Sequence, residues 1–321
     1  ALSCGADLVL ELPALFAVRA APDFARAGVA LLDGLSVVTH LSFGAENADL
    51  DALYRLAAPE SAQQSAALRA ALAKGLSHPA ARAMAMGEDM PPNVTIAVEY
   101  LRALRAAGSA MQPVPVARLA GHHDARLTAM PSATAVRLAL AKGDVGLTHC
   151  MPPEALRLLL AALPRPLPDL AGYSSVLLYL LRTTPPDALR QAYAIAEGLE
   201  NRLCREAFQA PDLTALLERV KCRRYPMARI RRLLTCILLG FTSERTQKHP
   251  APEYARVLAF RKSAAPLMRR IQQEGRLPLL VKAADAPRGE LLGLDMAAQD
   301  VWDLLSGRPA HRDLTEPLRI L

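Results

Sequence analysis

The first half of this sequence alternates short apolar runs with amphipathic segments, and this alternation constrains the fold more than any other feature. Leu8–Leu12 and Val37–Phe43 have the length and composition of buried strands, and Pro22–Leu35 between them has helical spacing and ends near Gly34. Strands that alternate with helices at such intervals predict a parallel α/β sheet covered by helices. Further on we predict a helical region over Leu50–Met86, a helix over Val94–Ala107, a strand over Val114–Val116 and a helix over Ala133–Lys142.

From about Met151 the pattern changes to a mostly helical one that is interrupted by prolines. We therefore predict an α/β domain over residues 1–150 and a mainly helical domain over residues 151–321. The helices expected in the second domain are Tyr173–Leu181, Pro186–Phe208, Asp212–Val220, Met227–Leu239, Pro252–Ile271 and one around Met296–Leu305, with a single strand at Leu277–Lys282.

Charge and cysteine usage limit the class of protein. The net charge of +7 and the isoelectric point near 9.4 favour contact with nucleic acid. The five cysteines form no CxxC pair, which is typical of reduced thiols in a cytoplasmic protein and argues against a zinc site. We find no run of eighteen apolar residues, so we expect no membrane span.

The segment Arg219–Arg232 is the strongest local charge feature. It holds seven Lys or Arg residues in fourteen positions and no acidic residue, with Tyr225 inside it. Two interpretations remain open from the residues alone: a solvated start of a helix, or a surface for a polyanion. The basic side chains that we assign to this surface are Lys221, Arg223, Arg224, Arg229 and Arg232.

The start of the predicted helix at residue 133 has the features of an anion site. Ser132 or Thr134 can cap this helix, and Arg137 follows within its first turns. Capping explains the hydroxyl residues, but a cation near a helix N-terminus opposes the helix dipole. Arg137 is better explained if a phosphate binds there, between the guanidinium and free backbone N–H groups.

Three other residues stand at the ends of predicted elements. Gly44 follows the strand Val37–Phe43, where a glycine lets a nucleotide approach the backbone, although it also simply makes turns. Asn93 directly precedes a predicted helix, where it serves either as an N-cap or as a ligand contact. Arg118 closes the strand at Val114–Val116, at the sheet edge where ligands gather, or is only a surface charge.

The cluster His122-His123-Asp124 invites a metal-site interpretation. Adjacent side chains rarely converge on one ion, and no further ligand lies at a suitable spacing, so we predict no metal site. One of these histidines with Asp124 could bond a substrate or shape a loop.

Eight motifs resemble, in order and over nearly the whole chain, the bacterial tRNA(Met) cytidine acetate ligase family. They are GADLVLELP at Gly5–Pro13, SFGAE at Ser42–Glu46, PNVTIAVEYLRAL at Pro92–Leu104, HHD at His122–Asp124, SATAVRLAL at Ser132–Leu140, EGLENRL at Glu197–Leu203, KCRRYPMARIRRLL at Lys221–Leu234 and YARVLAF at Tyr254–Phe260. EGLENR followed by the basic segment is specific to that family. The Ser-x-Thr-x-x-Arg element is shared more widely among adenylyl-transferring enzymes.

The resemblance implies a fold and an activity. It implies a Rossmann-like, HIGH-type nucleotidyltransferase domain followed by a helical tRNA-binding domain. It implies that ATP, with Mg²⁺, activates acetate as acetyl-adenylate, and that the acetyl group passes to N4 of the wobble cytidine in elongator tRNA(Met). By similarity Gly44, Asn93 and Arg118 would contact ATP, with Thr134 and Arg137 near its phosphates, and the basic segment would hold tRNA phosphates.

One departure from the family pattern concerns the first residues. The family's HxGH-type signature, on its first strand, would lie before Ala1, so we expect the catalytic residues upstream and weak or absent catalysis by this sequence alone. Ala1–Cys4 also reads as the end of a helix that closes at Gly5.

Two rival functions share parts of the pattern. The first is a nucleotidyltransferase that adenylylates a small cofactor precursor. The second is a helical RNA-binding module without enzymatic activity.

Overall fold

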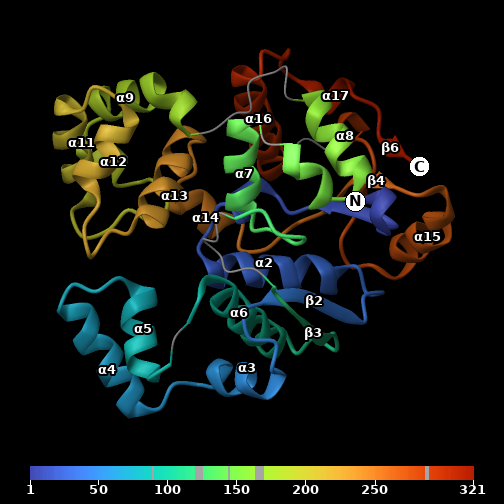
Figure 1. The fold of residues 1–321 in the computed structure, drawn as a ribbon, viewed down its shortest axis with the longest axis horizontal. Helices are drawn as coiled ribbons and strands as arrows, with labels where there is room; N and C mark the ends of the chain where they lie inside the picture. Colours follow the sequence, from blue (N-terminus) through green and yellow to red (C-terminus); the bar gives the residue numbers. More distant parts are fainter. Residues whose placement is uncertain (89, 120–125, 144, 163–169, 286–288) are drawn as a thin grey trace.

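A computed structural model describes residues 1–88, 90–119, 126–143, 145–162, 170–285 and 289–321 (Figure 1). The first α/β layer contains two parallel strands, β2 (His40–Ala45) and β3 (Gln112–Ala117), with Gly44 opposite Val116. Alternate residues of β2 are buried, and Leu41, Phe43 and Ala45 pack into one core with residues of α2 (Ala21–Gly34), α3 (Leu50–Ala57) and α6 (Pro92–Ala107). The parallel pairing predicted from the sequence is confirmed for β2 and β3.

A second, mixed sheet joins the two ends of the chain. The predicted strand at Leu8–Leu12 forms as β1 (Leu8–Glu11), but it pairs antiparallel with β4 (Ala255–Phe260) and not with β2. Two short strands, β5 (Leu279–Leu280) and β6 (Arg319–Ile320), lie parallel to β4. The placement of β1 in a parallel sheet with β2 was therefore wrong, and this sheet takes strands from both sides of residue 150.

The helical part has a core of its own. Leucines of α9 (Ser174–Thr183), α11 (Leu199–Gln209), α12 (Leu213–Val220) and α13 (Met227–Leu238) are buried together with Tyr225. In Figure 1 these helices form a group at the upper left, on the other side of the view from the labelled strands β4 and β6. The domain boundary near residue 150 remains a prediction.

Several smaller elements complete the fold. Between β2 and α6 lie α4 (Ala62–Ala73) and α5 (His78–Met86), and after β3 lie α7 (Ala133–Lys142), η2 (Val145–His149) and α8 (Pro153–Ala162). The remaining elements are η1 (Leu2–Cys4), α1 (Ala14–Ala17), η3 (Ala171–Tyr173), α10 (Pro186–Leu189), α14 (Ser243–Lys248), η4 (Lys262–Ala264), α15 (Ala265–Glu274), η5 (Ala283–Asp285), α16 (Glu290–Leu305) and α17 (Arg312–Thr315). Gly5 adopts φ 108° after η1, as expected for the end of a helix.

Two predicted helices were wrong in detail. The segment predicted as one helix over Pro252–Ile271 contains β4 and only then α15, because its apolar residues find a partner strand in β1. The helix predicted over Pro186–Phe208 is interrupted between α10 and α11, where Glu197 and Gly198 both have positive φ. None of the described helices is long and apolar enough to cross a bilayer.

Candidate functional site

The carboxyl ends of β2 and β3 bring Gly44 and Arg118 together. The backbone N–H of Arg118 donates to the carbonyl of Ala45 at 2.9 Å, which continues the strand pairing to this point. A Cβ atom at Gly44 would lie 3.5 Å from Cγ of Arg118, so the arginine side chain crosses the face of the glycine. Both residues are exposed. Each residue therefore lies at the carboxyl end of a strand, as the sequence predicted, and their contact with ATP stays a prediction.

Asn93 lies at the same end of the sheet because its side chain is hydrogen-bonded to Glu46. The Glu46 carboxylate, one residue beyond β2, accepts a hydrogen bond from Nδ2 of Asn93 at 2.7 Å and from the backbone N–H of Val94 at 2.9 Å. Asn93 is not the N-cap, because α6 already begins at Pro92 with Pro91 as its N-cap. The acidic side chain of Glu46 occupies the helix N-terminus instead, and sequence reasoning missed this role although Glu46 stood inside the motif SFGAE.

The hydrogen bonds keep Glu46 ionised. Partial burial of this carboxyl raises its pKa, but the bonds from the Asn93 side chain and from the backbone N–H groups outweigh it, so the pKa lies below its usual value. The carboxyl ends of β2 and β3 thus present the fixed carboxylate of Glu46, the oriented amide of Asn93 and the exposed guanidinium of Arg118 at one end of the sheet.

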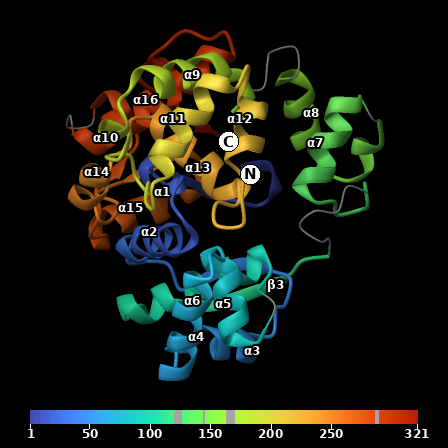
Figure 2. The same ribbon diagram turned by 90° about the vertical axis from the view of Figure 1, so that its left-hand side faces the viewer.

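The predicted phosphate residues lie on a different element. Ser132 caps α7 by accepting a hydrogen bond from the N–H of Ala135 at 3.1 Å, as expected. Thr134 is half-buried in the first turn of α7 and Arg137 is exposed one turn later. Figure 2 shows α7 and α8 set apart from β3 and α6. The described structure therefore does not bring Thr134 and Arg137 to Gly44, Asn93 and Arg118.

Metal ligation is not supported within the described residues. Across the described parts of the chain no three His, Cys, Asp or Glu side chains come close enough to hold an ion. The cluster His122-His123-Asp124 lies outside the described residues.

The basic segment forms the C-terminal end of α12, a tight turn and the start of α13. Cys222 and Tyr225 exchange backbone hydrogen bonds of 3.2 and 3.1 Å across the turn. The Tyr225 ring is buried, and its hydroxyl donates to the carbonyl of Glu197 at 2.8 Å. The EGLENR motif therefore supports the basic turn directly.

The five predicted tRNA contacts differ in their surroundings. Arg229 forms an ion pair with Glu197 at 3.2 Å and lies 5.3 Å from the centre of the Tyr225 ring. Lys221, Arg223 and Arg224 are exposed, and none pairs with a carboxylate of the described residues. Arg232 is half-buried on α13. Sequence reasoning left out Arg231, which is exposed on the same helix and belongs to the same acid-free run.

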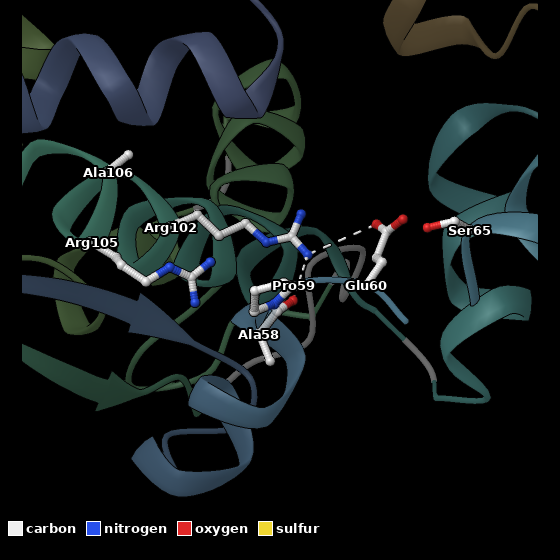
Figure 3. Close-up of a pocket in the computed structure, with 7 residues that line it drawn as sticks. All are labelled: Ala58, Pro59, Glu60, Ser65, Arg102, Arg105 and Ala106. Atoms are coloured by element: carbon white, nitrogen blue, oxygen red, sulfur yellow. Dashed lines mark hydrogen bonds and ion pairs between the residues drawn. The ribbon is translucent and has the colours of Figure 1, made fainter. Parts of the chain in front are cut away.

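A separate cleft of about 500 Å³ lies between α3, α4 and α6 (Figure 3). Its two arginines are already bonded, since Arg105 donates to the carbonyl of Ala57 at 2.9 Å and Arg102 reaches the same carbonyl at 3.4 Å. These contacts hold the last turn of α3. The cleft includes none of the residues predicted to bind ATP.

Residues 1–316 match the HIGH nucleotidyl transferase family, and curated relatives over the whole chain carry one name. The tRNA(Met) cytidine acetate ligase of Syntrophotalea carbinolica is 34% identical, with 100% of this chain and 85% of the relative covered. That of Bacillus velezensis is 33% identical, with 100% of this chain and 80% of the relative covered. The chain belongs to the tRNA(Met) cytidine acetate ligases of this family.

Solved structures of this ligase family agree with the fold. Thermotoga maritima TmcAL without ligand superimposes with a TM-score of 0.91 at 26% identity, covering 100% of this chain and 86% of the other. TmcAL bound with α-thio ATP gives a TM-score of 0.88 at 26% identity, covering 100% of this chain and 85% of the other. The resemblance found in the sequence is thereby confirmed.

Proposed function

We propose that this protein is an ATP-dependent ligase that acetylates N4 of the wobble cytidine in elongator tRNA(Met). Two features support the proposal together: the sheet edge formed by Gly44, Glu46, Asn93 and Arg118, and the basic turn supported by Glu197. The TmcAL structure with α-thio ATP supports ATP as the nucleotide, and the names of the curated relatives support the tRNA. We place the protein in the cytoplasm, with its tRNA substrate.

In the first step an oxygen of acetate attacks the α-phosphorus of ATP. The bond between that phosphorus and the bridging oxygen of pyrophosphate breaks, which gives acetyl-adenylate and pyrophosphate. Charge gathers on the α-phosphate during this step, and adenylation needs charge stabilisation more than a protein nucleophile. We assign that stabilisation to Arg118, whose exposed guanidinium lies beside Gly44 at the carboxyl end of β2.

In the second step the N4 amino group attacks the acetyl carbonyl carbon. The bond to the adenylate oxygen breaks, AMP leaves and N4 loses a proton. Asn93, oriented by Glu46, would contact the nucleotide throughout. We assign Thr134 and Arg137 to the triphosphate by the resemblance of their segment to the Ser-x-Thr-x-x-Arg element of adenylyl-transferring enzymes. Mg²⁺ enters with the nucleotide as part of the MgATP substrate.

The tRNA is held by the basic segment. Lys221, Arg223 and Arg224 are exposed with no carboxylate partner among the described residues, which suits contacts to phosphates. Arg229 and Arg232 complete this surface in the proposal, and the ion pair of Arg229 with Glu197 keeps the turn in place.

Two binding measurements test the proposal. Arg118→Ala should weaken ATP binding by calorimetry and leave tRNA affinity intact. The double variant Arg223→Ala/Arg224→Ala should weaken tRNA(Met) binding and lower its salt dependence, with ATP affinity unchanged. Unchanged tRNA binding by the double variant would make the basic segment a solvated surface only. Adenylate formation on a phosphorylated cofactor precursor instead of acetate would support the smaller nucleotidyltransferase.

A further inference from the structure

A second acid-free stretch lies on the α4–α5 hairpin. Residues 61–87 contain Arg69, Lys74 and Arg82 and no Asp or Glu. Arg69 and Lys74 are exposed, whereas Arg82 is buried. Arg82 pairs with Glu60 and Glu99, whereas Arg69 and Lys74 pair with no carboxylate of the described residues.

The turn of this hairpin touches the basic segment. A Cβ atom built on Gly75 would lie 3.8 Å from Nη2 of Arg224 and 4.0 Å from its Nε, so the guanidinium lies against the turn. Gly75 has φ +78°, a conformation that glycine adopts without strain. Figures 1 and 2 both place α4 and α5 on the side of the molecule where α12 and α13 are joined.

Lys74 precedes Gly75 directly, so its Cα lies within about 9 Å of the Arg224 guanidinium, given the spacing of consecutive Cα atoms. The backbone of Lys74 therefore lies close to the Arg224 guanidinium, and both side chains are exposed. The described structure places no carboxylate in an ion pair with either of them.

The hairpin is held in this position by a buried ion pair. Nη1 of Arg82 on α5 lies 2.5 Å from Oε1 of Glu99 on α6, and the two side chains are 6% and 8% exposed. Ala71 of α4 is also buried. Buried contacts of both α4 and α5 therefore hold the hairpin in place, with its turn next to the basic segment.

We propose that the α4–α5 turn forms a second part of the tRNA-binding surface, with Lys74 and Arg224 contacting phosphates of the same RNA. Both cations are exposed and lack a carboxylate partner among the described residues, so phosphates of one polyanion can pair with both. Lys74 is then a binding residue supplied by the α/β half of the chain. This inference rests on the proposed tRNA function and adds a contact outside the basic segment.

The test uses Lys74→Gln, which removes the charge without creating a partner for Arg224. The matched control is Lys262→Gln, an exposed lysine on η4 beside the mixed sheet. Affinity for tRNA(Met) is measured by filter binding between 50 and 300 mM KCl. We expect Lys74→Gln to bind roughly five- to tenfold more weakly at 0.1 M salt, with the slope of log K against log salt smaller by about one, and the control to match the unchanged protein.

Equal affinity and slope for Lys74→Gln and Lys262→Gln would overturn this inference. If Arg223→Ala/Arg224→Ala still weakens binding in the same assay, the proposed function survives and only the contact of the α4–α5 turn with tRNA is refuted. If none of the variants changes tRNA binding, the proposed function itself fails. A circular dichroism melt of each variant confirms that the fold is intact.

Discussion

Truncating Glu46 to alanine should destabilise the start of α6 and weaken nucleotide binding together. The carboxylate accepts hydrogen bonds from Asn93 Nδ2 at 2.7 Å, from the Val94 N–H at 2.9 Å and from the Asn93 N–H at 3.4 Å. Val94 is only 3% exposed, so water has little access to its side of the helix. After truncation these donors lose their acceptor.

The cost follows from these contacts. A buried donor left without a partner costs about 1–3 kcal/mol, and an acidic group at a helix N-terminus contributes about 0.3–1 kcal/mol. We therefore expect Glu46→Ala to lower the free energy of unfolding by about 2–3 kcal/mol. The pKa of Glu46 is lowered in the folded state, so its contribution is present above the unfolded pKa and is lost as pH falls through the folded pKa.

Urea unfolding at pH 7.5 measures this change, and calorimetry measures ATP affinity. The control is Glu274→Ala, which removes a 46% exposed partner of Arg270 and should leave stability nearly unchanged. Asn93 loses its orienting acceptor in Glu46→Ala, so ATP affinity should fall with stability. A loss no larger than that of Glu274→Ala, or unchanged ATP affinity, would refute the role assigned to Glu46.

Two further changes probe the supporting structure. Burial raises the pKa of Glu11 to about 7, against the opposing charge of Arg256, so the folded state binds this proton more tightly than the unfolded chain. Stability should then fall by up to about 3 kcal/mol as pH rises from about 4.5 to 7, and thermal melts of Glu11→Gln should show a flatter pH profile; an unchanged profile would rule this out. Tyr225→Phe removes the hydrogen bond to the Glu197 carbonyl and should cost about 1 kcal/mol in urea unfolding. The same variant should also weaken tRNA binding, and full tRNA affinity would show that the turn does not depend on this bond.

Local patterns predicted the elements whose partners lie nearby in the chain. The strands β2 and β3 and the helices around them follow from alternation and helical spacing, and Ser132 was recognised as a cap. The error at β4 has a physical reason: a short apolar run reads equally as a buried helix or a strand until its partner is known. That partner, β1, lies about 245 residues away, as the Glu11–Arg256 contact shows.

The candidate site was only partly predictable for a similar reason. Gly44 and Arg118 stand at adjacent strand ends, so a parallel sheet brings them together. For Asn93 the sequence left an N-cap and a ligand contact open, and the structure excludes the cap because Pro92 opens the helix, as proline does at the first helical position. The carboxylate of Glu46 took the capping role across 47 residues of sequence, and no local pattern reports such a contact.

The antiparallel pairing of β1 with β4 has a consequence for synthesis of the chain in the cell. The ribosome makes β1 before β4, and at about 5–20 residues per second this partner strand follows roughly 12–50 s later. Throughout that interval the edge of β1 that pairs with β4 lacks this partner, and unpaired strand edges are prone to association with other chains. The nascent protein therefore needs protection of this edge, and a chain that stops before Ala255 would leave β1 permanently without the partner that β4 supplies.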